Sequence, residues 1–235
     1  MSFSFLVFLG FLPSLAWLFF FLKEDIHPEP RKMVIRVFMM GALVTLLAIA
    51  IQLLLFRILN IFNIRTIGLF PFFAFAAVEE TLKFLAAYWI IRKSKFFDEA
   101  VDAMIYLIAA SLGFALIENI SVLTNVQVTS EAFGIITLRF VGATLLHALS
   151  SAIVGYYWAR GIMISRLLEQ PNNKERNFII KGIFIASILH TIFNYFILVF
   201  NEVLIYPTVF LAIIALFVFW DFEKIKMRSE NTNTS

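Results

Sequence analysis

Residues 37–56 read VFMMGALVTLLAIAIQLLLF, which is twenty consecutive residues without a charged side chain. An α-helix rises about 1.5 Å per residue, so this run can cross the roughly 30 Å of hydrocarbon in a bilayer. Three more uncharged runs have a similar length, at Phe3–Leu22, Phe140–Ala159 and Gly182–Asn201. The sequence therefore predicts a membrane protein that crosses the bilayer several times as helices.

Three further spans are predicted at Leu69–Ile91, Val101–Val122 and Val203–Trp220, the last after a tight turn at Asn201 and Glu202. Lys and Arg concentrate after the first, third, fifth and seventh spans, and such basic segments face the cytoplasm. The predicted fold class is all-α: a polytopic integral membrane helix bundle of about seven transmembrane helices, with the N-terminus outside and the C-terminus cytoplasmic. Residues 1–226 are expected to form a single domain, followed by a disordered polar tail at 227–235.

The composition excludes several classes of protein. Hydrophobic residues make up 61% of the chain and charged residues 15%, with a mean hydropathy of +0.90, which no water-soluble surface permits. No cysteine is present, so disulfides, thiolate zinc sites and cysteine nucleophiles are ruled out. The net charge is +3, but the basic residues lie in short loops between spans, where membrane topology accounts for them. Contact with a lipid bilayer is therefore expected, and nucleic-acid binding is not.

Polar and ionisable side chains interrupt four of the predicted spans. An ionisable group near mid-membrane costs at least about 2.5 kcal/mol, so a chain that keeps several is expected to use them. Counted from the outer end of their spans, the glutamates and histidines lie roughly 8–16 Å below the predicted outer surface. Four helices thus place carboxylates and imidazoles in one layer, which favours a single shared site. The interrupting residues are Glu79, Glu80, Lys83, Glu118, Asn119, His147, His190 and Asn194.

The spacing of these residues supports an inward-facing arrangement. Glu79 and Lys83 lie four residues apart and share a helix face, as do His190 and Asn194. Adjacent Glu79 and Glu80 differ by about 100° around the helix, so one is expected to act while the other braces the site.

Two polar residues are interpreted mainly as structural. Lys83 is expected to neutralise a neighbouring carboxylate within the membrane. Asp98 is placed to cap the fourth span at its cytoplasmic start, where acidic side chains suit the helix dipole.

The residue types narrow the chemistry of the shared site. Neither H-E-x-x-H nor G-x-S occurs, and the four aspartates lie near span ends, which disfavours the usual zinc helix, a rhomboid-like serine and an aspartyl dyad. A glutamate that activates water, with His and Asn donors at the developing oxyanion, suffices for amide hydrolysis. Alternatively, Glu and His could ligate Zn²⁺, which activates water by lowering its pKa. The sequence leaves both routes open.

Several motifs together resemble the PrsW family of intramembrane proteases. The ordered set is E-E-x-x-K, F-x-x-x-E, a lone His and H-x-x-x-N, and no single motif in it is specific. The set is carried by Glu79, Glu80 and Lys83, by Phe114, Glu118 and Asn119, by His147, and by His190 with Asn194. Further similar positions, which extend the resemblance over almost the whole chain, are Leu22–Asp25, Glu29, Pro30, Asp98, Asp102 and Tyr106. The CAAX prenyl protease superfamily is more remotely similar, because Lys83 stands one position early and Ala143 replaces a Phe.

The resemblance implies site-1 cleavage of a single-pass membrane protein, typically an anti-sigma factor, on the extracytoplasmic side of a bacterial cytoplasmic membrane. It implies that Glu79 or Glu80 activates water, while Glu118 and His147 complete the polar site. His190 and Asn194 then bind metal or stabilise the oxyanion. The supporting positions are Lys83, Asn119, Asp98 and Asp102, and the possible Zn²⁺ ligands are His147, His190, Glu118 and Glu80.

Two other classes of function stay open on the residues alone. Buried Glu, Lys and His also serve proton relays, so a proton-coupled transporter is one alternative, although no internal repeat or pair of broken helices supports it. A non-catalytic membrane protein that grips a substrate helix is the other. Replacing Glu80 by Gln separates them, because a hydrolase loses turnover whereas a binder loses little.

Overall fold

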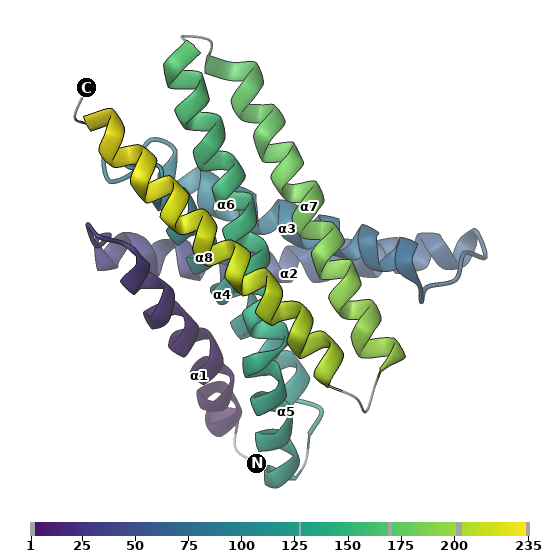
Figure 1. Ribbon diagram of the computed structural model, residues 1–235. Coiled ribbons are helices and arrows are strands. Elements are labelled where there is room, and N and C mark those ends of the chain that lie inside the picture. Colours follow the sequence, from purple (N-terminus) through teal and green to yellow (C-terminus); the bar gives the residue numbers. More distant parts are fainter. Residues whose placement is uncertain (1–2, 127, 169–170, 201–203, 234–235) are drawn as a thin grey trace.

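The computed structural model describes residues 3–126, 128–168, 171–200 and 204–233, which form helices joined by short connections (Figure 1). No strand occurs in these ranges. In chain order the helices are α1 (Phe3–Phe21), the short 3₁₀ helix η1 (Leu22–Glu24), α2 (Arg31–Ile61), α3 (Leu69–Ile91), α4 (Asp102–Leu123), α5 (Thr129–Val141), α6 (Ala143–Leu168), α7 (Pro171–Val199) and α8 (Ile205–Asn233).

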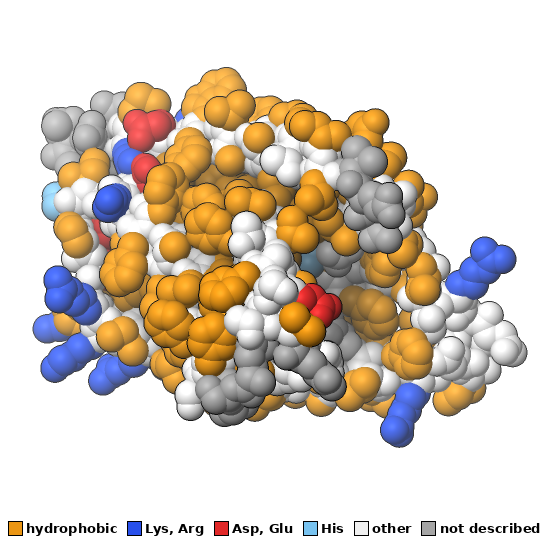
Figure 2. Space-filling model, turned by 90° about the horizontal axis from the view of Figure 1, so that it is seen from below, with side chains coloured by type: hydrophobic (Ala, Val, Ile, Leu, Met, Phe, Trp, Pro, Cys, Tyr) orange, Lys and Arg blue, Asp and Glu red, His pale blue; other side chains and the backbone are white. Residues whose placement is uncertain are grey.

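The helices have the lengths and surfaces that a membrane requires. Six stretches of the described chain are long and apolar enough to cross a bilayer. Helix α3 has 23 residues as well, but Glu79, Glu80 and Lys83 lie within it. Hydrophobic side chains cover the middle of the face in Figure 2, while Lys and Arg side chains lie toward its two ends. The prediction of a polytopic helix bundle is confirmed; the count of seven spans and the orientation of the termini stay predictions.

The helix boundaries differ from the predicted spans mainly around Gly142. Helix α3 has the predicted bounds, but the predicted span Phe140–Ala159 is divided, because Phe140 belongs to α5 and Gly142 separates α5 from α6. Helix α5 was not predicted from the sequence. Its short helix carries Arg139 in the last turn, which becomes important for the functional site.

Helix α4 forms the centre of the bundle, and nearly all of its side chains are buried. It packs against α1, α2 and α6, and small residues permit the close approach. A Cβ added at Gly113 would lie 1.8 Å from the Phe38 carbonyl oxygen, and one added at Gly41 would lie 1.8 Å from that of Ala110. The α2 and α4 backbones therefore touch at two points where only glycine fits.

The predicted capping of α4 by Asp98 is wrong. The helix begins at Asp102, and its N-cap residue Val101 makes no side-chain capping bond. Instead, the Asp102 carboxylate accepts hydrogen bonds from the backbone N–H groups of Asp98 and Glu99, at 3.1 and 2.8 Å. The chain ahead of Asp102 forms a bend and not a first helical turn, so Asp98 is too early to cap the helix.

The C-terminal helix α8 extends to Asn233, past residue 227 where the polar tail was expected to begin. The division of the chain into a domain at 1–226 and a disordered tail at 227–235 stays a prediction. The turn predicted at Asn201 and Glu202 lies outside the described residues.

The contact between α2 and α4 yields a stability prediction. Gly113→Ala is expected to lower the free energy of unfolding by about 1–3 kcal/mol, because the added methyl group forces the two backbones apart. Gly134→Ala on α5 is the matched control, since nothing lies within 4 Å of its added Cβ. Thermal unfolding of both variants in detergent measures the difference. Equal stability of the two variants would contradict the packing described for α4.

Candidate active site

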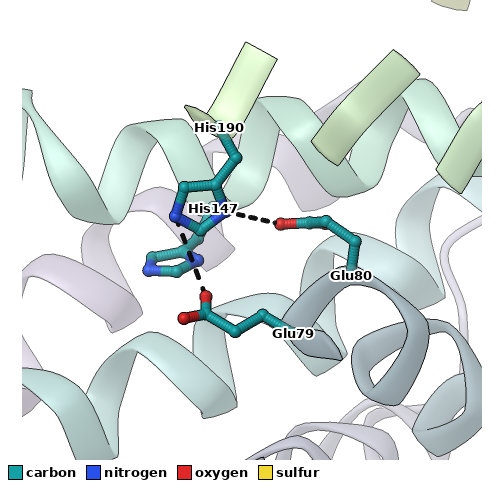
Figure 3. Close-up of side chains that lie close together, drawn as sticks. All are labelled: Glu79, Glu80, His147 and His190. Atoms are coloured by element: carbon teal, nitrogen blue, oxygen red, sulfur yellow. Dashed lines mark hydrogen bonds and ion pairs between the residues drawn. The ribbon is translucent and has the colours of Figure 1, made fainter. Parts of the chain in front are cut away.

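Four buried side chains from three helices converge within the bundle. Glu79 and Glu80 on α3, His147 on α6 and His190 on α7 point toward one another (Figure 3). One potential ligand atom of each lies within 4.8 Å of those of the other three. None of the four residues is more than 8% exposed. The structure therefore brings together side chains that are up to 111 residues apart in the chain, as the depth estimate predicted for a shared site.

Lys83 supplies a positive charge at the centre of this cluster. Its side chain is fully buried, and its ammonium donates to Glu80 Oε1 at 2.8 Å and to His147 Nδ1 at 2.6 Å. Glu79 Oε2 lies 3.5 Å from the same ammonium. Residues three and four positions apart share a helix face, so α3 alone fixes Lys83 beside both carboxylates.

The two adjacent glutamates occupy different environments. Glu80 Oε1 accepts hydrogen bonds from Lys83, from His190 Nδ1 at 2.9 Å and from the Ser150 hydroxyl at 3.2 Å. Glu79 Oε1 accepts one hydrogen bond, from the Gln52 amide at 2.8 Å, while its Oε2 lies 3.8 Å from His190 Nε2. The Glu79 side chain is 11% exposed and that of Glu80 is 0% exposed. Glu80 is thus held firmly by its neighbours, and Glu79 is the more accessible carboxylate.

His147 connects the cluster to α4. A lysine ammonium cannot accept a hydrogen bond, so the Lys83 contact assigns the acceptor role to Nδ1 and leaves the proton on Nε2. That Nε2–H donates to Glu118 Oε2 at 2.8 Å. Arg139 at the end of α5 contacts Glu118 Oε2 at 3.0 Å through Nη2 and donates to Asn119 Oδ1 at 2.5 Å through Nε. Glu118 is therefore held by both an imidazole and a guanidinium, while Asn119 is held by the guanidinium.

Four residues that contact this network were missed from the sequence: Arg139, Gln52, Ser150 and Thr144, whose hydroxyl contacts the Asn119 amide at 3.3 Å. Arg139 was not selected because it borders an uncharged run and its partner is twenty-one residues away. Gln52 did carry a signal, since it is the only amide in the predicted span Val37–Phe56. Ser150 carried none, because a hydroxyl costs little within a membrane helix and many serines serve only their own backbone.

Asn194 lies beside the cluster and not within it. It lines a cavity of about 360 Å³ together with Arg139, Gly142, Phe193 and Leu211, between the α5–α6 junction and helices α7 and α8. Because Arg139 also contacts Glu118, this largely apolar cavity adjoins the polar network. Asp98 and Asp102 are remote, since Asp102 and Glu118 are sixteen residues apart on one straight helix, about 24 Å.

The cluster also fits a metal ion. Glu79 Oε2 and Glu80 Oε2 are buried and have no hydrogen-bond partner, so each offers a free electron pair inside the site. Glu79, Glu80, His147 and His190 would hold the ion, and carboxylates with imidazoles are a donor set that Zn²⁺ takes. His147 would bind through Nδ1, which requires the Lys83 ammonium to move away from that nitrogen. The ligand set expected from the sequence has Glu118 where the structure has Glu79. In the structure Glu118 accepts a hydrogen bond from His147 and orients it, as carboxylates behind metal-binding histidines do.

The fold and site define a polytopic membrane protein with a buried glutamate–histidine centre, an arrangement suited to hydrolysis within the bilayer. Residues 29–220 match the family described as PrsW family intramembrane metalloprotease. The chain belongs to this family, and it is a peptidase of a bacterial membrane that it crosses several times.

Named relatives agree with this assignment. The chain is 30% identical over 223 residues to Protease PrsW of Oceanobacillus iheyensis, covering 95% of each chain. It is 27% identical to Protease PrsW of Geobacillus kaustophilus, over 80% of this chain and 78% of the relative. Protease PrsW of Clostridioides difficile is 28% identical, over 81% and 78%. No solved structure gives a significant match. The family resemblance is confirmed, and a peptidase is favoured over the carrier and the non-catalytic binder.

The buried charge of Lys83 yields a prediction for the stability of the site. Lys83→Met is expected to lower the free energy of unfolding by about 3–5 kcal/mol, because Glu79 and Glu80 become unpaired buried carboxylates. Adding Glu80→Gln to Lys83→Met should recover part of that loss. Denaturant titration in detergent measures both, with exposed Lys93→Met as the control. A Lys83→Met protein as stable as the control would mean that the ammonium does not balance these charges.

Proposed function

We propose that this chain hydrolyses a peptide bond of a single-pass membrane protein near the extracytoplasmic side, the site-1 cleavage for which an anti-sigma factor is the typical substrate. The observation that carries the proposal is the buried Glu79 Oε2, an oxygen without a hydrogen-bond partner among two histidines and a lysine. Such an oxygen can take a proton from water, and the neighbouring Lys83 ammonium stabilises the negative charge that develops.

In the proposed reaction Glu79 is the general base. Its Oε2 is free, and the Gln52 amide on its other oxygen fixes the carboxylate orientation. Glu80 serves as the brace, since Lys83, His190 and Ser150 already occupy its Oε1. After water attacks the scissile carbonyl carbon, the protonated Glu79 passes its proton to the leaving amine, which closes the proton balance.

A donor for the oxyanion comes from the same cluster. The Lys83 ammonium lies 3.5 Å from Glu79 Oε2. His190 donates its Nδ1 proton to Glu80, so the Nε2 of the neutral ring, 3.8 Å from Glu79 Oε2, is an acceptor. A donor that is already in place costs no reorganisation when the oxyanion forms. When a metal ion is bound by the four ligand residues, it supplies Lewis-acid polarisation and a lowered pKa of water.

The cavity beside the cluster supports binding of the substrate as an unwound segment. Its walls are largely apolar, while Arg139 and Asn194 offer polar groups at the side that adjoins the site. In a helix the backbone carbonyl groups are hydrogen-bonded to N–H groups of the same helix and the peptide bonds are shielded, so a segment must be unwound before it is cleaved. The carbonyl groups freed by unwinding then need hydrogen-bond donors such as Arg139 and Asn194. Figure 2 views the molecule from below and shows a histidine side chain within a hollow on this face, between hydrophobic groups. With the N-terminus outside, as the sequence predicts, this face lies on the extracytoplasmic side.

The proposal is tested by quantitative mass spectrometry of membrane-protein termini. Cells that carry the native chain are compared with cells that carry Glu79→Gln or the exposed control Glu131→Gln at matched expression. New extracytoplasmic termini are expected with the native and control chains, and Glu79→Gln should reduce them about 10²- to 10⁴-fold. Termini that persist undiminished in Glu79→Gln would exclude this residue as the base; termini absent even with the native chain under stress would count against the proposed cleavage.

Metal removal distinguishes activation of water by a glutamate base alone from activation by a bound metal ion. If the four ligand residues hold Zn²⁺, chelation of the purified protein abolishes cleavage, and added Zn²⁺ restores it together with about one bound ion per chain. Elemental analysis and cleavage of the substrate found above are measured on the same samples. Full activity in metal-free protein would leave Glu79 as the sole activator of water.

A further inference from the structure

A second group of carboxylates lies at the opposite end of α4 from Glu118. Asp25 and Glu29 belong to the connection between α1 and α2, and Asp102 is the first residue of α4. One carboxylate oxygen of each lies within 4.8 Å of the others. Asp25 is 6% exposed and Asp102 is 1% exposed, while Glu29 is partly buried. Nothing in the proposed reaction uses these residues.

Hydrogen bonds from neutral groups satisfy only part of this group. Asp102 accepts the backbone N–H groups of Asp98 and Glu99, and Asp25 Oδ1 accepts that of His27 at 3.0 Å. Tyr106 donates its hydroxyl to Glu29. Asp25 Oδ2 is fully buried and has no hydrogen-bond partner. A buried carboxylate oxygen without a donor is costly, which points to a ligand that the protein itself does not provide.

The charges of the three carboxylates are also unbalanced. Within the described ranges no Lys or Arg forms an ion pair with any of the three, and the nearby His27 pairs with Glu99 at 2.7 Å. Burial raises the pKa of the Asp25 carboxyl. Burial also raises the pKa of Glu29, and the charge of Asp25 adds to that effect. Glu29 and Asp102 share a side-chain hydrogen bond, and Asp25 repels the Glu29 charge. A cation that enters among the three carboxylates relieves the repulsion between their ionised forms.

We propose that Asp25, Glu29 and Asp102 bind a divalent cation at a site separate from the active site. Only oxygen donors are present, which suits the hard cations Mg²⁺ and Ca²⁺ and disfavours Zn²⁺. A neighbouring cavity of about 430 Å³, lined by His27, Pro28, Glu29 and Asp98 among others, provides an entry path and room for the water ligands that Mg²⁺ retains.

The bound cation fastens the α1–α2 connection to the start of α4. Residues 25–30 make few other polar contacts with α4, namely the Tyr106 bond and the approach of Glu29 to Asp102. Since α4 is the central helix and carries Glu118 and Asn119 near its other end, a cation at Asp102 helps to fix the register of that helix in the bundle.

Terbium luminescence tests the site directly, because Tb³⁺ replaces Ca²⁺ among oxygen ligands and Tyr106 adjoins Glu29 as a sensitiser. The full chain in detergent is titrated with Tb³⁺, and then Mg²⁺ or Ca²⁺ is added. We expect saturable binding of one ion that either cation displaces. Asp25→Asn should weaken it about tenfold or more, since the charge count of the ligands sets affinity. Asp98→Asn is the matched control, because Asp98 lines the same cavity outside the group.

Two further variants keep the outcome unambiguous. Glu79→Gln alters only the intramembrane cluster, so it should leave the Tb³⁺ signal unchanged; loss of the signal in this variant would place the ion in the active site and overturn the proposal. Glu29→Gln replaces Asp25→Asn if that variant does not fold. Equal affinity of the native chain and a folded Asp25→Asn or Glu29→Gln variant, or no saturable binding to the native chain, would equally overturn it.

Discussion

The buried ammonium of Lys83 is the constraint on which the active site depends. It reaches two carboxylates of its own helix and one imidazole of α6, with no exposure to solvent. A charge in this position is tolerated only when opposite charges and hydrogen-bond acceptors surround it closely. The charge of Lys83 is compensated within α3, and its hydrogen bond to the His147 Nδ1 links α3 to α6. His190 joins α7 to the same arrangement through Glu80.

Helix α4 connects this charged centre with the rest of the bundle. Gly113 of α4 and Gly41 of α2 bring these two helices to backbone distance, and Gly155 of α6 approaches Met104 in the same way. Helices packed this closely cannot easily shift along their axes, because a shift would bring a side chain of one helix against the backbone of the other. The polar groups at both ends of α4 are thus held at a fixed separation: Glu118 and Asn119 at one end, and the carboxylate of Asp102 at the other.

The sequence predicted the membrane helices and the members of the central cluster. Both can be read directly along the chain: the length of an uncharged run predicts a span, and an ionisable residue inside a span marks a site. Depth counting then placed Glu79, Glu80, His147 and His190 in one layer, where the structure also has them. The sequence did not predict the direction in which each side chain points around its helix. Asn194 shares a helix face with His190 only approximately, since four residues turn the helix by about 400°, and it faces the neighbouring cavity. The role of Arg139 could be predicted only by placing it at the end of α5. The break between α5 and α6 at Gly142 is marked by no proline and no charged residue at the break itself.

The balance of charges gives a physical reason to place the base at Glu79. Three carboxylates, Glu79, Glu80 and Glu118, face two permanent cations, Lys83 and Arg139, so one negative charge stays uncompensated when both histidines are neutral. Glu118 and Glu80 each have a cation within 3.0 Å, whereas Glu79 has its nearest cation at 3.5 Å. The surplus charge therefore resides mainly on Glu79, whose Oε2 has no donor. A proton taken from water neutralises Glu79 and moves the surplus negative charge to the attacking oxygen. In the proposed reaction that charge then develops on the oxyanion, close to the Lys83 ammonium, which lies 3.5 Å from Glu79 Oε2.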